Sequence, residues 1–243
     1  MGNVALKLNR YYPNKREIED LRPKEKTFMS SVQCSRIAPC GNVACVACGL
    51  ATKAWFIAVV NELFSKINSK LDCVSLIQSK LIFGGSELNR IDIKKCARKY
   101  RDLVRNADPS SRIWVGAIDV SYNVQRSPID VRQWCVHAML ITTALETAER
   151  TRLKELLPAT ELVSRPRMIK SVYDLNGIAD YTFKHRFVQR ERYFDSGGNP
   201  RVVDFELKGT AQSQFMYRFQ DVPHTDRLIT IGCRRQGNTL RIG

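Results

Sequence analysis

Alternating apolar residues between positions 113 and 143 predict two neighbouring strands joined by a polar connection that contains a proline. In the second run, 134–141, the odd and the even positions are both largely apolar. A strand that is apolar on both faces is normally covered on both faces, so this pair is expected at the centre of a sheet. Asp119 lies in the first run and His137 in the second, where the two side chains can face each other.

Apolar residues at intervals of three and four predict a helix that follows residue 50 and a second helix over 91–107. Further helices are expected over 146–157, 175–187 and 211–219, strands over 73–83 and 168–172, and a hairpin over 191–207 that turns at 196–199. The chain ends in a basic, strand-like segment. This mixture predicts an α+β fold, with a central antiparallel β-sheet flanked by helices.

The pattern divides the chain into three regions. Residues 1–33 mix charges with tyrosines and prolines and are expected to form a basic, poorly packed N-terminal arm, which either follows a phosphate backbone or is an unstructured tail. Residues 34–72 contain a cluster of cysteines and the helix that follows it, and residues 73–243 contain the predicted sheet.

Charge points to a polyanion as the partner. The 243 residues include 39 Lys and Arg against 24 Asp and Glu, a net charge of +15 that is spread along the chain. Nucleic acid is favoured over an anionic membrane surface, because no predicted helix combines a bulky apolar face with a free end. No apolar run reaches the roughly 18 residues of a membrane span, and the first residues lack a signal-peptide pattern, so a cytoplasmic protein is predicted.

A basic stripe runs along the predicted helix 91–107, and two arginines lie in the terminal strand. Such a stripe is either a solvated face or a set of phosphate contacts. The candidate DNA-binding residues are Lys94, Arg98, Arg101, Arg105, Arg234 and Arg235.

Four of the eight cysteines, Cys34, Cys40, Cys45 and Cys48, fall within fifteen residues at the spacing C-x5-C-x4-C-x2-C. Four thiolates satisfy a tetrahedral zinc ion without an open position, so the pattern favours a small structural zinc knuckle. The alternatives are a cysteine-rich loop without metal and a redox pair at Cys45 and Cys48, which would leave the other two unexplained. The remaining cysteines are expected to be small buried hydrophobic residues: Cys73, Cys96, Cys135 and Cys233.

Asp119 and His137 carry polar groups in otherwise apolar strands. A buried carboxylate is costly unless it is paired or binds a metal. A lone histidine in such a strand is either a hydrogen-bonded core residue or a ligand.

Tyr181 lies in the predicted helix 175–187, with Lys184 and His185 at i+3 and i+4. A phenol is a weak nucleophile unless positive charge or a metal assists it. The alternative is a tyrosine that packs against the sheet beside exposed basic neighbours. Tyr173 is the nearest rival, and it lacks a basic residue at i+3.

Taken in order, the knuckle, the strand pair GAIDVSYN and WCVHAML, and the motif Tyr181-x-x-Lys184 resemble the rolling-circle replication initiators of plasmids and phages, which belong to the His-hydrophobic-His endonuclease superfamily. The resemblance implies that 73–243 binds single- or double-stranded origin DNA and acts as a metal-dependent endonuclease and strand transferase. It implies that Tyr181 attacks a DNA phosphate, that Lys184 offsets the charge, and that Mg²⁺ or Mn²⁺ assists. Host replication proteins are implied as further partners.

The chain departs from the family pattern at the metal-binding strand. The family has two histidines separated by one residue, whereas here Cys135 and Met139 flank His137. Asp119 could supply an oxygen ligand beside His137, and Cys135 with His137 would suit Zn²⁺ instead. The second hypothesis is therefore a non-catalytic, zinc-containing nucleic-acid-binding protein with a degenerate metal site.

Overall fold

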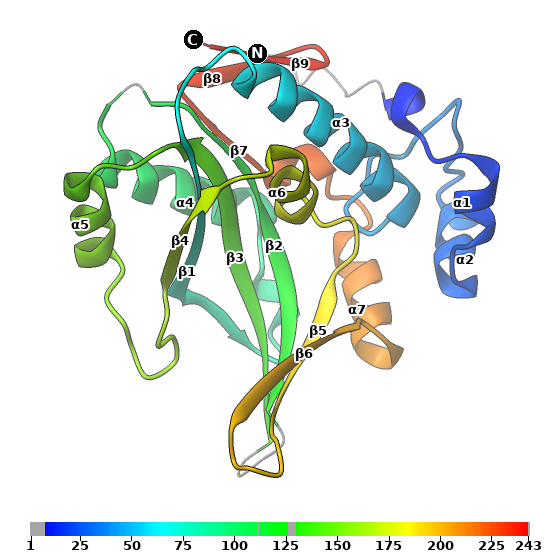
Figure 1. The fold of residues 1–243 in the computed structure, drawn as a ribbon. Coiled ribbons are helices and arrows are strands. Elements are labelled where there is room, and N and C mark those ends of the chain that lie inside the picture. Colours follow the sequence, from blue (N-terminus) through cyan, green and yellow to red (C-terminus); the bar gives the residue numbers. More distant parts are fainter. Residues whose placement is uncertain (1–7, 111, 126–129, 243) are drawn as a thin grey trace.

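The structure is a computed structural model that describes residues 8–110, 112–125 and 130–242. It is an α+β fold in which helices flank a central curled sheet (Figure 1), which confirms the predicted fold class. Among the described residues every strand pair is antiparallel except the pair formed by β2 and β5. The strand order is β4 (Arg167–Val172), β1 (Leu71–Gly84), β3 (Val131–Thr143), β2 (Trp114–Gln125), β5 (Val188–Phe194) and β6 (Pro200–Glu206).

The two central strands, β2 and β3, are the pair that the alternation predicted. Their register places Asp119 directly opposite His137. The other edge of β2 is shared between two partners, because 114–117 pairs with β7 (Leu228–Ile231) and 121–125 pairs with β5. Asp119 therefore lies at the point where the neighbour of β2 changes.

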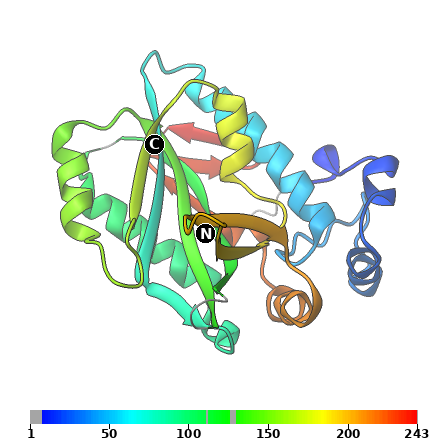
Figure 2. The same ribbon diagram turned by 60° about the horizontal axis from the view of Figure 1, so that its bottom comes forward.

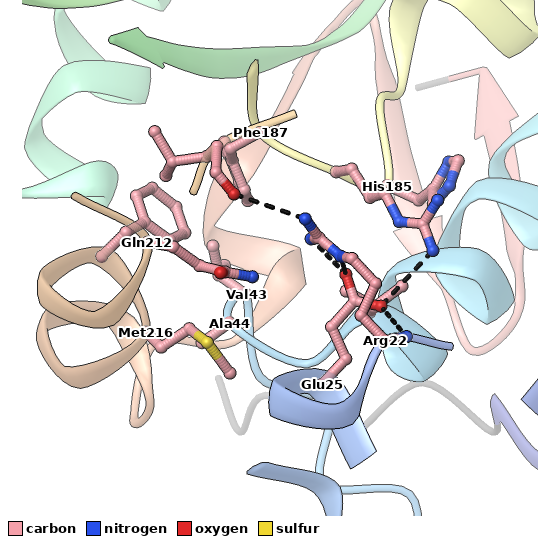
Figure 3. Close-up of a pocket in the computed structure, with 12 residues that line it drawn as sticks. Arg22, Glu25, Val43, Ala44, His185, Phe187, Gln212 and Met216 are labelled. Atoms are coloured by element: carbon pink, nitrogen blue, oxygen red, sulfur yellow. Dashed lines mark hydrogen bonds and ion pairs between the residues drawn. The ribbon is translucent and has the colours of Figure 1, made fainter. Parts of the chain in front are cut away.

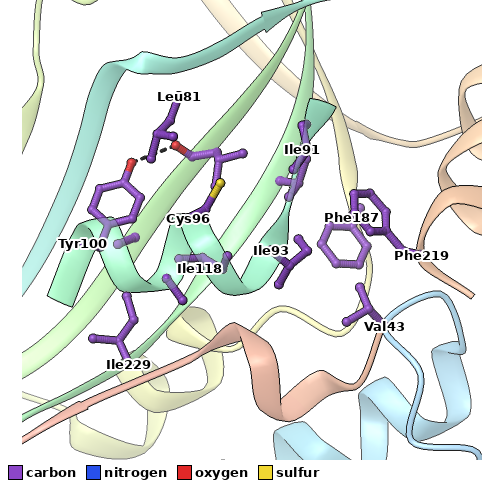
Figure 4. Packing of buried hydrophobic residues seen from close by; sticks show 14 of the residues in the cluster. Val43, Leu81, Ile91, Ile93, Cys96, Tyr100, Ile118, Phe187, Phe219 and Ile229 are labelled. Atoms are coloured by element: carbon purple, nitrogen blue, oxygen red, sulfur yellow. Dashed lines mark hydrogen bonds between the residues drawn. The ribbon is translucent and has the colours of Figure 1, made fainter. Parts of the chain in front are cut away.

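Helices cover the two faces of the sheet unequally. On one face α4 (Ile93–Ala107) packs against alternate residues of β2 and β3, and the Tyr100 hydroxyl donates to the carbonyl of Val136 at 2.8 Å (Figure 4). On the other face α3 (Val46–Phe64) and α6 (Leu175–Thr182) lie side by side (Figures 1 and 2). Asp119 and His137 belong to this second face, because they share the alternation of Val115, Ala117 and Ile141, which pack against α3.

α3 is the central helix of that second face. By length and composition it could cross a membrane, with a mean hydropathy of 1.4, but 56% of that window is buried within the fold. Buried core helices commonly share this length and composition, and α3 contributes Trp55, Phe56 and Val59 to a core cluster. Against α3 lies a terminal ribbon of β8 (Cys233–Gln236) and β9 (Thr239–Ile242).

The expectation of a poorly packed N-terminal arm is wrong for the described residues 8–31. They form η1 (Leu8–Tyr11), α1 (Lys15–Glu19) and α2 (Pro23–Ser31), and Leu8, Leu21 and Phe28 join the main core. Buried Glu25 is paired with Arg22 (Figure 3), and it is also paired with Arg186 from the loop that follows α6.

The helix predicted over 175–187 ends earlier than expected, at Thr182. Asp174 caps its start by accepting from the backbone N–H of Gly177, and Phe183 leaves the helix to pack on Phe56 with ring centroids 5.4 Å apart. The apolar contact of Phe183 thus ends the helix, and Lys184 lies in the following loop. The remaining elements are α5 (Thr147–Leu156), η2 (Leu88–Arg90), α7 (Gly209–Phe219) and η3 (His224–Arg227), and the predicted hairpin is formed by β5 and β6.

Candidate active site and four-cysteine centre

A buried carboxylate and a buried imidazole meet at the centre of the sheet. Asp119 Oδ2 lies 3.4 Å from His137 Nε2, and both side chains are almost fully buried. Oδ1 of Asp119 accepts the backbone N–H of Val120 at 2.9 Å, whereas Oδ2 has no partner of hydrogen-bond geometry among the described residues. A buried carboxylate oxygen in this state is suited to an ion pair or to a bound cation.

Lys184 supplies a cation at the same oxygen. Its Nζ lies 3.3 Å from Asp119 Oδ2 and 5.4 Å from the centroid of the Tyr181 ring. The Tyr181 side chain is half exposed at the C-terminal end of α6. Tyr181, Lys184, Asp119 and His137 therefore converge from α6, the loop after it, β2 and β3, although the first two do not share a helix.

Burial keeps the two neighbouring titratable groups of β3 neutral. It lowers the pKa of His137 to about 4, against the opposing charge of Asp119, and it raises the pKa of Cys135 to about 12. His137 thus offers a lone pair near neutral pH, whereas the Cys135 thiol stays protonated and is a poor ligand for a hard cation. Asp119 and His137 together could hold a divalent cation. Lys184 would then bind the same Asp119 carboxylate as that cation.

His185 does not flank Tyr181 as the helical pattern predicted. It lies beside the Arg22 and Glu25 pair (Figure 3). Burial, followed by the charge of Lys53, lowers its pKa to about 4, so it carries no positive charge near neutral pH. Tyr173, the rival nucleophile, is 98% exposed and outside this cluster.

A cleft of about 640 Å³ opens on this side of the sheet, between the β5–β6 hairpin and the loop before β4. Arg165, Arg190 and Arg192 line it, and no Asp or Glu does so in the described part of the chain; we call these three the cleft arginines. Arg190 is held by two hydrogen bonds to Asp204, of 2.7 and 3.0 Å. Its pKa is raised by that pairing and, more weakly, by Tyr181 and Asp119, so the cleft adjoins the site.

The four clustered cysteines converge as predicted. The Sγ atoms of Cys34, Cys40, Cys45 and Cys48 all lie within 4.8 Å of one another, with contacts of 3.4 to 3.6 Å, and could hold a metal ion. Cys45 is the N-cap residue of α3 and Cys48 lies in its first turn. Hydrogen bonds from the other three thiols lower the pKa of Cys34, and the hydrogen bonds to Cys34 raise the pKa of Cys45 and Cys48. The isolated cysteines are buried as expected.

The helix that begins at this centre also supports the candidate active site. A Cβ added to Gly49 would lie 2.8 Å from the carbonyl oxygen of His185, in the loop that carries Lys184. Further along α3, Lys53 forms a 2.6 Å ion pair with Asp180, the residue before Tyr181. The four-cysteine centre and Tyr181 are therefore linked through one helix.

The basic residues proposed from the sequence lie apart from Tyr181. Lys94, Arg98 and Arg105 are exposed on α4, which covers the opposite face of the sheet. Arg101 is half-buried on the same helix, and Arg234 and Arg235 belong to β8 at the terminal ribbon. Sequence reasoning missed the cleft arginines, although the alternation of Arg190 and Arg192 in a hairpin strand places both on one face.

No family model, curated protein or solved structure matches this chain. The resemblance to rolling-circle initiators rests on short motifs alone.

Proposed function

We propose that this protein nicks and rejoins one strand of DNA through Tyr181, as an initiator of rolling-circle replication would. The observation that carries the proposal is the convergence of an exposed tyrosine with Lys184, Asp119 and His137. These side chains are supplied by segments far apart in the sequence. Burial of the Asp119 carboxylate costs desolvation free energy, and an apolar residue at this position of the sheet would avoid that cost.

Tyr181 is the proposed nucleophile. Its phenolic oxygen forms a bond to a backbone phosphorus, the bond from that phosphorus to the 3′ oxygen breaks, and the 3′ oxygen takes up a proton while the phenol loses one. Lys184, close to the ring, offsets the negative charge of the phenolate and of the phosphate. A divalent ion held by Asp119 and His137 would polarise the phosphate. The products are a 5′-phosphotyrosine and a free 3′ hydroxyl.

The cleft arginines are proposed to hold the strand that leads to Tyr181. Guanidinium groups bind phosphate oxygens, and Arg165 and Arg192 offer positive charge with no carboxylate among the described lining residues, whereas Arg190 is already paired with Asp204 outside the lining. Apolar side chains such as Ile77, Leu162 and Val202 also line it and could contact bases. A cleft of this kind favours a single strand that is separated from its complement.

The four-cysteine centre is proposed to hold a structural zinc ion. Four thiolates bound at about 2.3 Å in a tetrahedron lie roughly 3.8 Å from one another, close to the spacing of the Sγ atoms. Backbone N–H groups of Cys40 and Gly41 donate to Cys34 and Cys48, as is common around thiolate ligands. Its role would be to fix the start of α3 and, through α3, the position of α6.

The test uses single-stranded oligonucleotides of random sequence that carry a fluorophore at the 3′ end, incubated with the protein and Mn²⁺. A covalent adduct on a denaturing gel is expected for the wild-type protein, and sequencing of the bound strands would give the recognition sequence. Tyr181→Phe removes one oxygen, so the adduct should disappear while DNA affinity changes less than twofold.

Tyr173→Phe is the matched control, because Tyr173 is a fully exposed tyrosine eight positions earlier and should be dispensable. Mass spectrometry that finds the nucleotide on Tyr173 would replace the nucleophile. Absence of any adduct with wild-type protein and several divalent ions would favour the second hypothesis, a zinc-containing nucleic-acid-binding protein without catalysis.

A further inference from the structure

Arg227 is a fully buried arginine that no part of the proposed reaction uses. It is 0% exposed at the end of η3, and its guanidinium lies between two aromatic rings, 4.4 Å from the centroid of Phe183 and 4.9 Å from that of Phe187. Burial lowers its pKa to about 10, while the charge of Asp119 opposes that shift. Arg227 therefore stays positively charged near neutral pH, in a region where a buried charge is costly unless its donors are satisfied.

One donor of Arg227 fills a break in the sheet. Between its pairings with β7 and β5, strand β2 leaves residues 118–120 without a strand partner on that edge. Arg227 Nε donates to the carbonyl of Ile118 at 3.1 Å, in the peptide that leads into Asp119. The arginine thus takes the place of a strand at the residue that carries the carboxylate.

A second donor reaches the loop after α6. Arg227 Nη2 donates to the carbonyl of Lys184 at 2.9 Å, and the two rings that enclose the guanidinium come from the same loop. One side chain therefore binds the carbonyl of Lys184 and the carbonyl of Ile118, the residue before Asp119, and so joins the two segments whose side chains form the Asp119–Lys184 ion pair.

His224 holds the remaining side of the guanidinium. Its Nδ1 lies 3.4 Å from Arg227 Nη1, and its Nε2 lies 3.5 Å from the carbonyl of Cys45, the N-cap residue of α3. The contacts run continuously from the four-cysteine centre through His224 and Arg227 to the candidate active site.

We propose that Arg227 is a positioning residue that sets the spacing between Asp119 and Lys184, and hence the approach of Tyr181 to the phosphate. This inference rests on the proposed nicking function. A lysine could satisfy only part of this set, because its compact ammonium cannot lie over both rings and donate to three separated acceptors at once. The planar fork of arginine is what the three acceptors require.

The test compares Arg227→Lys with the wild-type protein in three measurements. Adduct formation with the random 3′-labelled oligonucleotides should slow between about tenfold and a hundredfold, since a displacement of about 1 Å costs up to that much. Affinity for the same oligonucleotides should change less than twofold. Hydrogen exchange should speed up at least tenfold in 183–187 and 116–120 and stay unchanged in α4.

Arg218→Lys is the matched control. Arg218 also stacks on a phenylalanine, Phe219, and donates to one backbone carbonyl, that of Ile91 at 2.8 Å, but it lies on α7 away from the site. It should leave all three measurements unchanged. If Arg227→Lys does not fold, Arg227→Met, which fills the same slot without donors, takes its place.

Wild-type adduct rate and exchange in the Arg227 variant would overturn the proposal. Faster exchange that extends through α4 would also overturn it, because it would indicate a general loss of stability. If the wild-type protein forms no adduct, the nicking function fails, whereas local exchange in the two segments still decides whether Arg227 ties them together.

Discussion

Gly49→Ala perturbs the candidate active site from the four-cysteine side. Gly49 lies in α3, and a Cβ at that position would meet the carbonyl oxygen of His185 at 2.8 Å and its Cα at 3.4 Å. Both are backbone atoms, so no side-chain rotation can relieve the contact. The loop that carries Lys184 must move away from the helix.

The size of the effect can be worked from that contact. Carbon and oxygen atoms approach to about 3.3 Å, so the loop has to retreat by roughly half an ångström. Alanine favours a helix over glycine by about 1 kcal/mol, and overpacking costs about 1–3 kcal/mol, so the free energy of unfolding should fall by about 0–2 kcal/mol. Since 1 Å of misplacement can cost about a hundredfold in rate, adduct formation should slow by roughly tenfold.

The assay measures adduct formation at saturating oligonucleotide, together with metal content and urea denaturation. The matched control is Ala54→Gly, at an exposed position of the same helix, which should cost about 1 kcal/mol of stability without touching the loop. A Gly49→Ala protein with the wild-type rate, or a control that slows as much, would refute the link between α3 and the position of Lys184.

Three other predictions concern acid, metal and salt. The free energy of unfolding should fall as pH drops from about 6.5 toward 4, by roughly 2 kcal/mol at pH 5 for each of the fully buried His137 and His224. The reason is that these two imidazoles bind protons in the unfolded chain but stay neutral in the folded chain. Urea titrations at pH 7 and 5 measure the change, and His224→Gln should make the free energy of unfolding depend less on pH. Cys45→Ser or a zinc chelator should unfold the centre and the start of α3, seen as lost helical circular dichroism and metal content; an unchanged spectrum would exclude a structural metal. DNA affinity should fall with salt, and Arg192→Ala should reduce the slope of log affinity against log salt by about 0.7 if it binds a single-strand phosphate; an identical slope would remove it from the interface.

The periodicity of apolar residues was sufficient to predict the strands at the centre of the sheet. Two-residue alternation on both faces of 114–143 predicted a central strand pair, and it also predicted that Asp119 and His137 could face each other, which the register confirms. The convergence of the four cysteines was also predicted, because their spacing over fifteen residues suits four ligands of one metal ion. Local patterns of this kind need no knowledge of distant contacts.

Contacts between segments far apart in the sequence could not be predicted from local patterns. The predicted helix that contains Tyr181 is longer than the observed one. Phe183 leaves the helix to pack against Phe56, and helical spacing in the sequence does not reveal this tertiary contact. The positioning role of Arg227 could not be predicted from the sequence. Arg227 lies in a short turn before a strand, and the carbonyls that it binds belong to residues more than forty positions away. A brief helix near 16–21 could be read from the sequence, but the packing of segment 8–31 against the core was not predicted, because it depends on contacts with distant residues.

The divided edge of β2 has a consequence for the order in which the chain is made. Asp119, His137, Tyr181 and Lys184 leave the ribosome well before Arg227 and β7. Until Arg227 and β7 arrive, residues 114–117 of β2 lack the strand that pairs with them on that edge, and the Arg227 side chain does not yet join the carbonyl of Ile118 to that of Lys184. The geometry of the candidate site would therefore be completed only after Arg227 and β7 have joined the sheet, and under the proposed nicking function a shorter nascent chain would be inactive.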